Sequence, residues 1–131
     1  MNEQYQNKIV DEVISKTQNI IGVSIVYFLD NNFQIIKEFK KVDTKNYLNQ
    51  VTQIIQSDLN LNALAIAFNL KPFHTYTFLN ENGLILISTL QSKNLYLVII
   101  AGEKEPTDLI SLLKICKEAR LSFQNLLSTN V

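Results

Sequence analysis

Residues 75–87 have the sequence TYTFLNENGLILI, and this stretch predicts a β-hairpin. Residues 73–79 are β-branched or aromatic at most positions, which is typical of a strand. Residues 80–83 end in Asn-Gly, the strongest short-range hairpin signal, and residues 84–90 supply the second strand. Residues 95–101 are apolar throughout and predict a third strand. The C-terminal half is therefore expected to contain three consecutive strands.

Helices are predicted before, between and after the strands. Ile9, Val10, Val13 and Ile14 recur at the spacing of one helix face. Pro106 stands where a first-turn proline is tolerated, at the start of a last amphipathic helix. The predicted order is α-β-β-α-β-β-β-α, with a helix at 3–19, strands at 23–29 and 33–39, a helix from 44 whose spacing continues through Leu64, Ala65 and Phe68, strands at 73–79, 84–90 and 95–101, and a helix at 106–127.

Strand composition predicts which strands are central. Residues 84–87 and 95–100 are apolar at consecutive positions, and residues 23–29 are nearly so. Strands of this kind are buried on both faces, which requires helices above and below the sheet. We therefore expect an α/β (α+β) sandwich with helices on both faces.

The two predicted edge strands differ in charge. Residues 33–39 carry Lys37 and Glu38, and such charges blunt an exposed edge against unwanted pairing. Residues 73–79 carry no charge and no internal proline, so this edge needs a cover. We predict that the same strand of a second copy covers it, because antiparallel self-pairing follows from two-fold symmetry. The alternative is that a loop or the preceding helix shields it.

Bulk composition bounds the function. The chain has 131 residues and zero formal net charge, so we expect one domain over 1–131 and no selection for nucleic acid or an anionic membrane. The single cysteine fits a reducing compartment. No apolar run approaches a membrane span, and the N-terminus has no export signal. We expect a soluble, cytoplasmic protein without membrane insertion.

No catalytic, cofactor or metal site is predicted. His74 and Cys116 are the only residues of their types, so no Cys/His metal cluster exists. The glycine-rich phosphate-binding motifs are absent, and the acidic residues are dispersed. Cys116 lies on the apolar stripe of the last helix and is expected in the core. His74 is expected to be a packed or interface residue. The chain is not expected to be an enzyme.

The hairpin at 75–87, the apolar strand at 95–101 and the closing helix at 106–127 resemble the Roadblock (dynein light chain) domain family, a relative of the longin and profilin-like folds. The resemblance is to a prokaryotic-type member associated with small GTPases. It implies a five-stranded antiparallel sheet, with the first and last helices on one face and the second helix on the other. Residues 105–108, Glu-Pro-Thr-Asp, depart from the Asn-Leu-Gly-like segment of many members.

The resemblance also implies dimers joined through the third strand and the second helix, so that ten strands form one sheet. The dimer would be a homodimer or a pair with a paralogous Roadblock chain, and it would bind or regulate a Ras-like small GTPase. The predicted dimer interface comprises Phe73, His74, Thr75, Tyr76, Thr77, Phe78, Tyr47, Leu48, Val51, Ile54 and Ile55. The predicted GTPase-binding surface comprises Lys45, Asn46, Asn49, Gln53 and Gln56.

Two other functions remain open from the sequence. One is a small-molecule sensor module in the PAS or GAF style, which would need a pocket with convergent polar groups. The other is a structural subunit of a motor or trafficking heteromer. Arg120, the sole arginine, is expected to be an exposed helix charge on the last helix, across the sheet from the second helix. An arginine finger is therefore not the expected route to GTPase activation.

Overall fold

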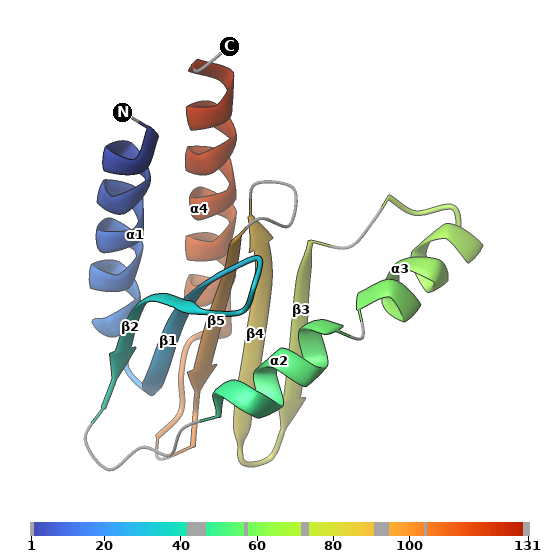
Figure 1. Ribbon diagram of the computed structural model, residues 1–131. Helices are drawn as coiled ribbons and strands as arrows, with labels where there is room; N and C mark the ends of the chain where they lie inside the picture. The colour runs from blue at the N-terminus through green and yellow to red at the C-terminus, as the bar shows by residue number, and fades with distance from the viewer. Residues whose placement is uncertain are drawn as a thin grey trace.

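The computed structural model describes residues 2–41, 47–56, 58–71, 74–90, 95–103 and 105–129. Its order agrees with the predicted one except that the second helix is two helices placed end to end (Figure 1). Ser57 stands between them in the sequence, and Ser and Asp favour helix caps over helix interiors. The elements are α1 (Asn2–Gln18), β1 (Val23–Asp30), β2 (Ile35–Lys40), α2 (Leu48–Gln56), α3 (Asp58–Ala67), β3 (Thr75–Asn80), β4 (Gly83–Leu90), β5 (Leu95–Ala101) and α4 (Leu109–Thr129).

The five strands form one antiparallel sheet in the order β2-β1-β5-β4-β3. β5 is buried along its whole length, and β1 is buried except at Asp30. Their consecutive apolar residues face helices on both sides, as the composition predicted. β2 and β3 are the two edge strands, which also agrees with the prediction.

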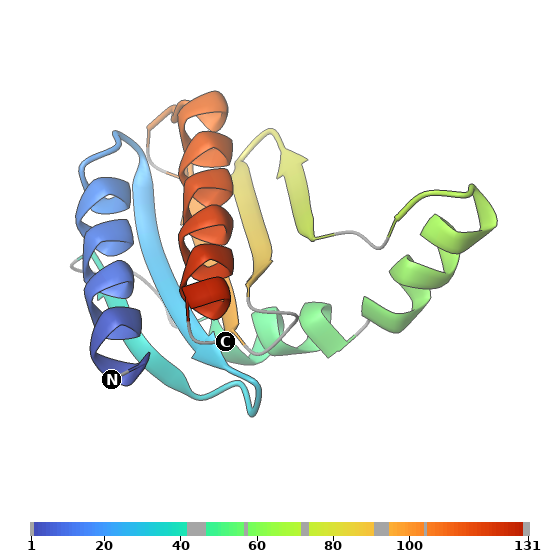
Figure 2. The same cartoon turned by 90° about the horizontal axis from the view of Figure 1, so that it is seen from above.

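The helices form a layer on each face of the sheet. α1 and α4 lie side by side on one face, and α2 crosses the other face (Figures 1 and 2). This is the arrangement that the resemblance implied. β3 projects past α4 at the side of the sheet away from α1 (Figure 2).

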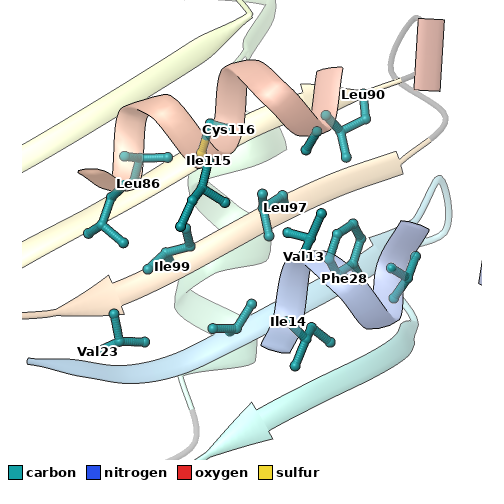
Figure 3. Packing of buried hydrophobic residues seen from close by; sticks show 14 of the residues in the cluster. Val13, Ile14, Val23, Phe28, Leu86, Leu90, Leu97, Ile99, Ile115 and Cys116 are labelled. Carbon is teal, nitrogen blue, oxygen red and sulfur yellow. The ribbon is translucent and has the colours of Figure 1, made fainter. Parts of the chain in front are cut away.

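One core lies between the sheet and the α1/α4 layer (Figure 3). Val13 of α1, Phe28 of β1 and Cys116 of α4 meet there, and each is at most 7% exposed. The Phe28 and Phe123 rings lie 6.5 Å apart, centroid to centroid, and link the sheet to α4. Burying each large apolar side chain of this kind contributes about 1.5–3 kcal/mol, so this layer supplies much of the stability.

A second core lies between the sheet and α2. Val51 and Ile55 of α2 pack on it, together with Tyr27 and Val98 of the central strands. Burial raises the pKa of Tyr27, and a backbone hydrogen bond with Tyr47 opposes this shift in part. That hydrogen bond fixes the start of α2 over β1.

The predicted hairpin is confirmed. β3 and β4 pair in register from Thr75 opposite Ser88 to Asn80 opposite Gly83. The N–H of Asn82 donates to Oδ1 of Asn80 at 2.7 Å, which closes the turn. Gly83 has a φ of 149°, in the region that favours glycine, so the Asn-Gly signal corresponds to a real backbone requirement.

Candidate interaction surface

The outer edge of β3 is open within the described chain. β3 pairs with β4 on one side, and no other strand of the described residues pairs with it. No residue from Thr75 to Asn80 is charged. Phe78 is 41% and Leu79 is 68% exposed. An uncharged edge with exposed apolar side chains is a template for pairing with another strand.

The opposite edge is protected. β2 carries Lys37 and Glu38, and the Lys37 ammonium donates a hydrogen bond to the Asp11 carboxylate of α1. The charges and the contact with α1 make β2 a poor template for strand addition. The two edges of the sheet therefore differ in chemistry, and only β3 is suited to self-pairing.

The pairing with β4 assigns each β3 side chain to a face. Tyr76 lies opposite Ile87, which belongs to the core beneath α2. Directly opposed residues share a face and side chains alternate along a strand, so Phe78 also faces the α2 side. Thr75 and Thr77 face the α1/α4 side. A partner strand at this edge would continue both faces of the sheet.

The structure corrects two of the predicted interface residues. Val51 is fully buried and Ile55 is 5% exposed, because both side chains pack on this chain's own sheet. Both side chains face the sheet and anchor α2 on it. Tyr47, Leu48 and Ile54 are half-buried at the margin of the same core, so part of each remains available for contact.

The outer face of α2 is polar. Asn49, Gln53 and Gln56 are exposed, on the side of α2 away from the sheet. These three belong to the predicted GTPase-binding surface, and the fold brings them onto one helix next to β3. Three other predicted residues lie outside the described residues: Lys45, Asn46 and Phe73.

Arg120 and His74 are close enough to interact electrostatically. His74 is exposed just before β3, and its pKa is lowered first by burial and second by the positive charge of Arg120. Arg120 lies on α4, across the sheet from α2, as predicted. Its side chain is half-buried, and its Nε is buried with no hydrogen-bond partner among the described residues, so it is not simply an exposed helix charge.

The described residues contain no group of three or more His, Cys, Asp or Glu side chains that could hold a metal ion. Burial raises the pKa of the Cys116 thiol to about 12, although Arg120 nearby opposes the shift. Such a thiol is protonated at neutral pH and is a poor nucleophile. In the part of the chain that is described, no helix has the length and apolarity that crossing a membrane requires.

Sequence reasoning missed an apolar surface on α3. Leu64 and Ile66 of α3 are 49% and 70% exposed, and Phe68 and Leu70 just beyond the helix are 69% and 54% exposed. α3 extends beyond the edge that β3 forms (Figure 2). The signal was present in the sequence, because residues 59–70 contain no charge. Their large apolar side chains and alanines are spaced too closely to face one small core together.

A pocket of about 360 Å³ opens on the α2 side of the sheet at the end of β3. We call it the β3-end pocket. The Tyr47 hydroxyl donates a hydrogen bond to Oε2 of Glu103 at 3.5 Å, and both residues line the pocket together with the exposed Phe78. Residues that line it include Tyr47, Phe78, Leu79, Ile85, Ile100 and Glu103.

Comparison with known proteins finds no match for the sequence but several solved structures with a similar fold. A scan of protein families and a search of curated proteins each find no match. MglB of Myxococcus xanthus superposes with a TM-score of 0.69 over 95% of both chains, at 14% identity. The Roadblock/LC7 domain from Streptomyces avermitilis superposes with a TM-score of 0.66 over 90% of this chain and 97% of that one, at 15% identity.

The chain has the Roadblock/LC7 fold. Two further MglB structures agree with this assignment. The gliding protein MglB from Thermus thermophilus has a TM-score of 0.69 and 12% identity over 95% of this chain and 90% of that one. MglB in a tetrameric arrangement has a TM-score of 0.69 and 13% identity over 99% of this chain and 93% of that one. The Roadblock resemblance inferred from the hairpin and the last helix is thus confirmed at the level of the fold.

Proposed function

We propose that residues 1–131 act as one Roadblock-type domain, which forms a two-fold dimer and serves in the cytoplasm as a non-catalytic scaffold for a Ras-like small GTPase. The open edge of β3 carries the proposal. It is uncharged, it has a strand neighbour on one side only among the described residues, and it exposes Phe78 and Leu79. An edge of this kind is expected to be covered in a protein that stays soluble.

A second copy is the simplest cover for this edge. Two identical strands related by a two-fold axis run antiparallel, so their hydrogen-bonding groups match without any further adaptation. Thr75 and Thr77 would then continue the α1/α4 face, and Tyr76 and Phe78 the α2 face. Leu48 and Ile54, half-buried on α2, would meet their counterparts above the seam. A paralogous Roadblock chain could take the same place.

The GTPase part of the proposal rests on the family resemblance and on the surface that a dimer would create. Two-fold pairing at β3 would bring two α2 helices together and double the polar surface of Asn49, Gln53 and Gln56. Lys45 and Asn46, which precede α2, would extend this surface. Such a polar, pre-formed platform suits a transient partner, because transient interfaces are about as polar as the rest of a protein surface.

Sedimentation of the purified chain tests the dimer. We expect the wild type to be a dimer at micromolar concentration and Thr77→Lys to be a monomer or to precipitate, because a cation would enter the seam. Ile36→Lys is the matched control, since Ile36 is 37% exposed on the opposite edge strand β2. It should remain a dimer. A monomeric wild type would overturn the homodimer, and a dimer that Thr77→Lys leaves intact would place the seam elsewhere.

A binding assay with a Ras-like GTPase encoded beside the same gene tests the partner. We expect Asn49→Arg and Gln56→Arg to weaken binding, because both residues are exposed on the outer face of α2. Lys114→Glu, at an exposed position of α4 on the opposite face, is the control and should bind like the wild type. Equal binding by all variants would remove α2 from the interface.

Arg120→Ala tests the mechanism if the complex accelerates GTP hydrolysis. An arginine finger is worth about 10³–10⁵ in rate where one is used. Arg120 lies across the sheet from α2, so we expect activation to persist and to come from repositioning of the partner's own residues. A complete loss of activation in a variant that still binds would mean that Arg120 reaches the nucleotide.

A further inference from the structure

α3 is a well-terminated helix with an unusual surface. The N–H of Leu70 donates to the carbonyl of Ala65 at 2.8 Å, and the N–H of Asn69 donates to the carbonyl of Ile66 at 3.0 Å. Asn69 has a φ of 58°, so these bonds form a Schellman cap with a left-handed residue just past the helix end. The cap gives α3 a defined end, although the apolar side chains around it face solvent.

The exposed apolar side chains on and after α3 need a neighbour that the described chain does not provide. Ile66 and Phe68 are 70% and 69% exposed, and Leu64 and Leu70 are about half exposed. Contiguous exposed apolar residues on a small protein mark an interaction site. α3 follows α2 end to end and extends past β3, away from β4 (Figures 1 and 2).

The position of α3 decides what it would meet. A chain added at the edge of β3 must occupy the space beside β3, and α3 extends from the α2 side of the sheet into the region beyond that edge (Figure 2). Any partner whose strand extends the sheet there must therefore contact α3. In a two-fold pair, each α3 contacts the other chain in the same way.

Strand direction then selects the region of the partner that α3 would contact. In an antiparallel pair, the start of one β3 lies beside the end of the other. Residues 68–74 connect α3 to the start of β3, so the α3 of one chain would emerge near the other chain's Asn80. The β3-end pocket lies at that end of β3 and on the same face. The apolar side chains of α3 therefore approach a pocket whose lining includes Phe78, Ile85 and Ile100.

The charges and the apolar area around the β3-end pocket also favour α3 of a second copy as the element that covers it. Lys71 is exposed in the connection that follows α3, and Glu81 and Glu103 are exposed around the end of β3, with Glu103 lining the pocket. The two-fold pair would place opposite charges near one another at both ends. Five exposed apolar side chains, each contributing on the order of 100 Å², would supply more than half of the roughly 800 Å² per partner of a standard interface. These are Leu64, Ile66, Phe68, Leu70 and Phe78.

We infer that α3 is an exchanged arm: in the dimer, its apolar side chains cover the β3-end pocket of the second copy. This rests on the proposed two-fold pairing at β3. Phe68, which is large and exposed at the end of the helix, is the side chain expected to contribute most.

Cross-linking between two differently tagged chains tests the arm. One chain carries Phe68→Cys and the other Asn82→Cys, both in a Cys116→Ala background, and a short bis-maleimide is added to the mixture. Because each chain has a single cysteine, a mixed-tag product between these chains reports Phe68 of one copy near the pocket of the other. We expect this product, and we expect none when Lys114→Cys on α4 replaces Asn82→Cys.

Sedimentation of the same samples separates this inference from the dimer proposal. A dimer without the Phe68–Asn82 product overturns the arm and leaves the dimer standing, whereas a monomer overturns both. As a second measure, Phe68→Gln should raise the dimer dissociation constant at least about tenfold, as loss of an interface anchor does. Ile110→Gln, which alters a 79% exposed residue of α4, should leave the constant unchanged. An unchanged constant for Phe68→Gln also overturns the arm.

Discussion

Gly102 lies directly against Gly83: a Cβ on Gly102 would stand 3.1 Å from the Cα of Gly83. The contact joins the end of β5 to the start of β4. The N–H of Gly102 also donates to the carbonyl of Gly22 at 2.8 Å, so three turns of the chain meet at this end of the sheet. The same region supports the end of β3 and the pocket beside it.

Gly83→Ala is therefore expected to destabilise the fold. A Cβ on Gly83 would stand 2.7 Å from the carbonyl oxygen of Ala101, which is backbone and cannot easily move, and the φ of 149° is strained for alanine. We expect a loss of about 1–3 kcal/mol in the free energy of unfolding, measured by urea denaturation. Glu81→Ala, in the exposed turn just before Gly83, should change it by less than about 0.5 kcal/mol. Equal stabilities would mean that the backbone relaxes there freely.

His74 gives a direct measure of the charge near the open edge. It is the only histidine, so its imidazole can be followed alone by NMR titration. We expect a pKa below 6.5, lowered by burial and by Arg120. Arg120→Gln should raise the pKa of His74 toward 6.5. A pKa at or above 6.5 in the wild type would show that Arg120 and His74 are not neighbours.

The same shift predicts a pH dependence of stability. Because the folded-state pKa of His74 lies below the unfolded value, the unfolded chain binds more protons as the pH falls through 6.5. Stability should therefore decrease from pH 7 toward the folded-state pKa. His74→Gln should remove this part of the dependence, as measured by urea denaturation at a series of pH values.

The Cys116 thiol should be unreactive in the folded protein. Its side chain is 1% exposed and its pKa is raised to about 12 by burial, so little thiolate forms at neutral pH. A thiol reagent should label Cys116 only after unfolding in urea. Leu113→Cys in a Cys116→Ala background, at a position that is 40% exposed on the same helix, should react rapidly without urea. Rapid labelling of native Cys116 would show that α4 opens readily.

Much of the fold could be predicted because its signals are local. The Asn-Gly turn, the consecutive apolar runs of β4 and β5 and the helical spacing in α1 each depend on residues close in sequence. The charged β2 and the uncharged β3 were also recognised as the two edges from composition alone. The residues of a strand indicate whether it is covered on both faces. Composition therefore predicted which strands are central and which lie at the edges of the sheet.

The candidate site was harder to predict from the sequence, because it depends on how the helices pack on the sheet. Sequence spacing placed Val51 and Ile55 on the interacting side of the second helix, but that helix has one apolar face and the sheet of its own chain takes it. The division into α2 and α3 was missed for a similar reason. The helical spacing of apolar residues continues across residue 57 in the sequence. The direction in which α3 extends depends on where α2 packs on the sheet.

The sequence by itself determined the strands, the open edge and the absence of phosphate-binding motifs, since each follows from residue types at short range. Only the tertiary structure decided that Arg120 approaches His74, that the β3-end pocket forms beside Glu103, and that the apolar side chains of α3 lack a neighbour among the described residues. These features join residues that are far apart along the chain. Their distances are set by the sheet register and by the seating of α2 and α4 on its two faces.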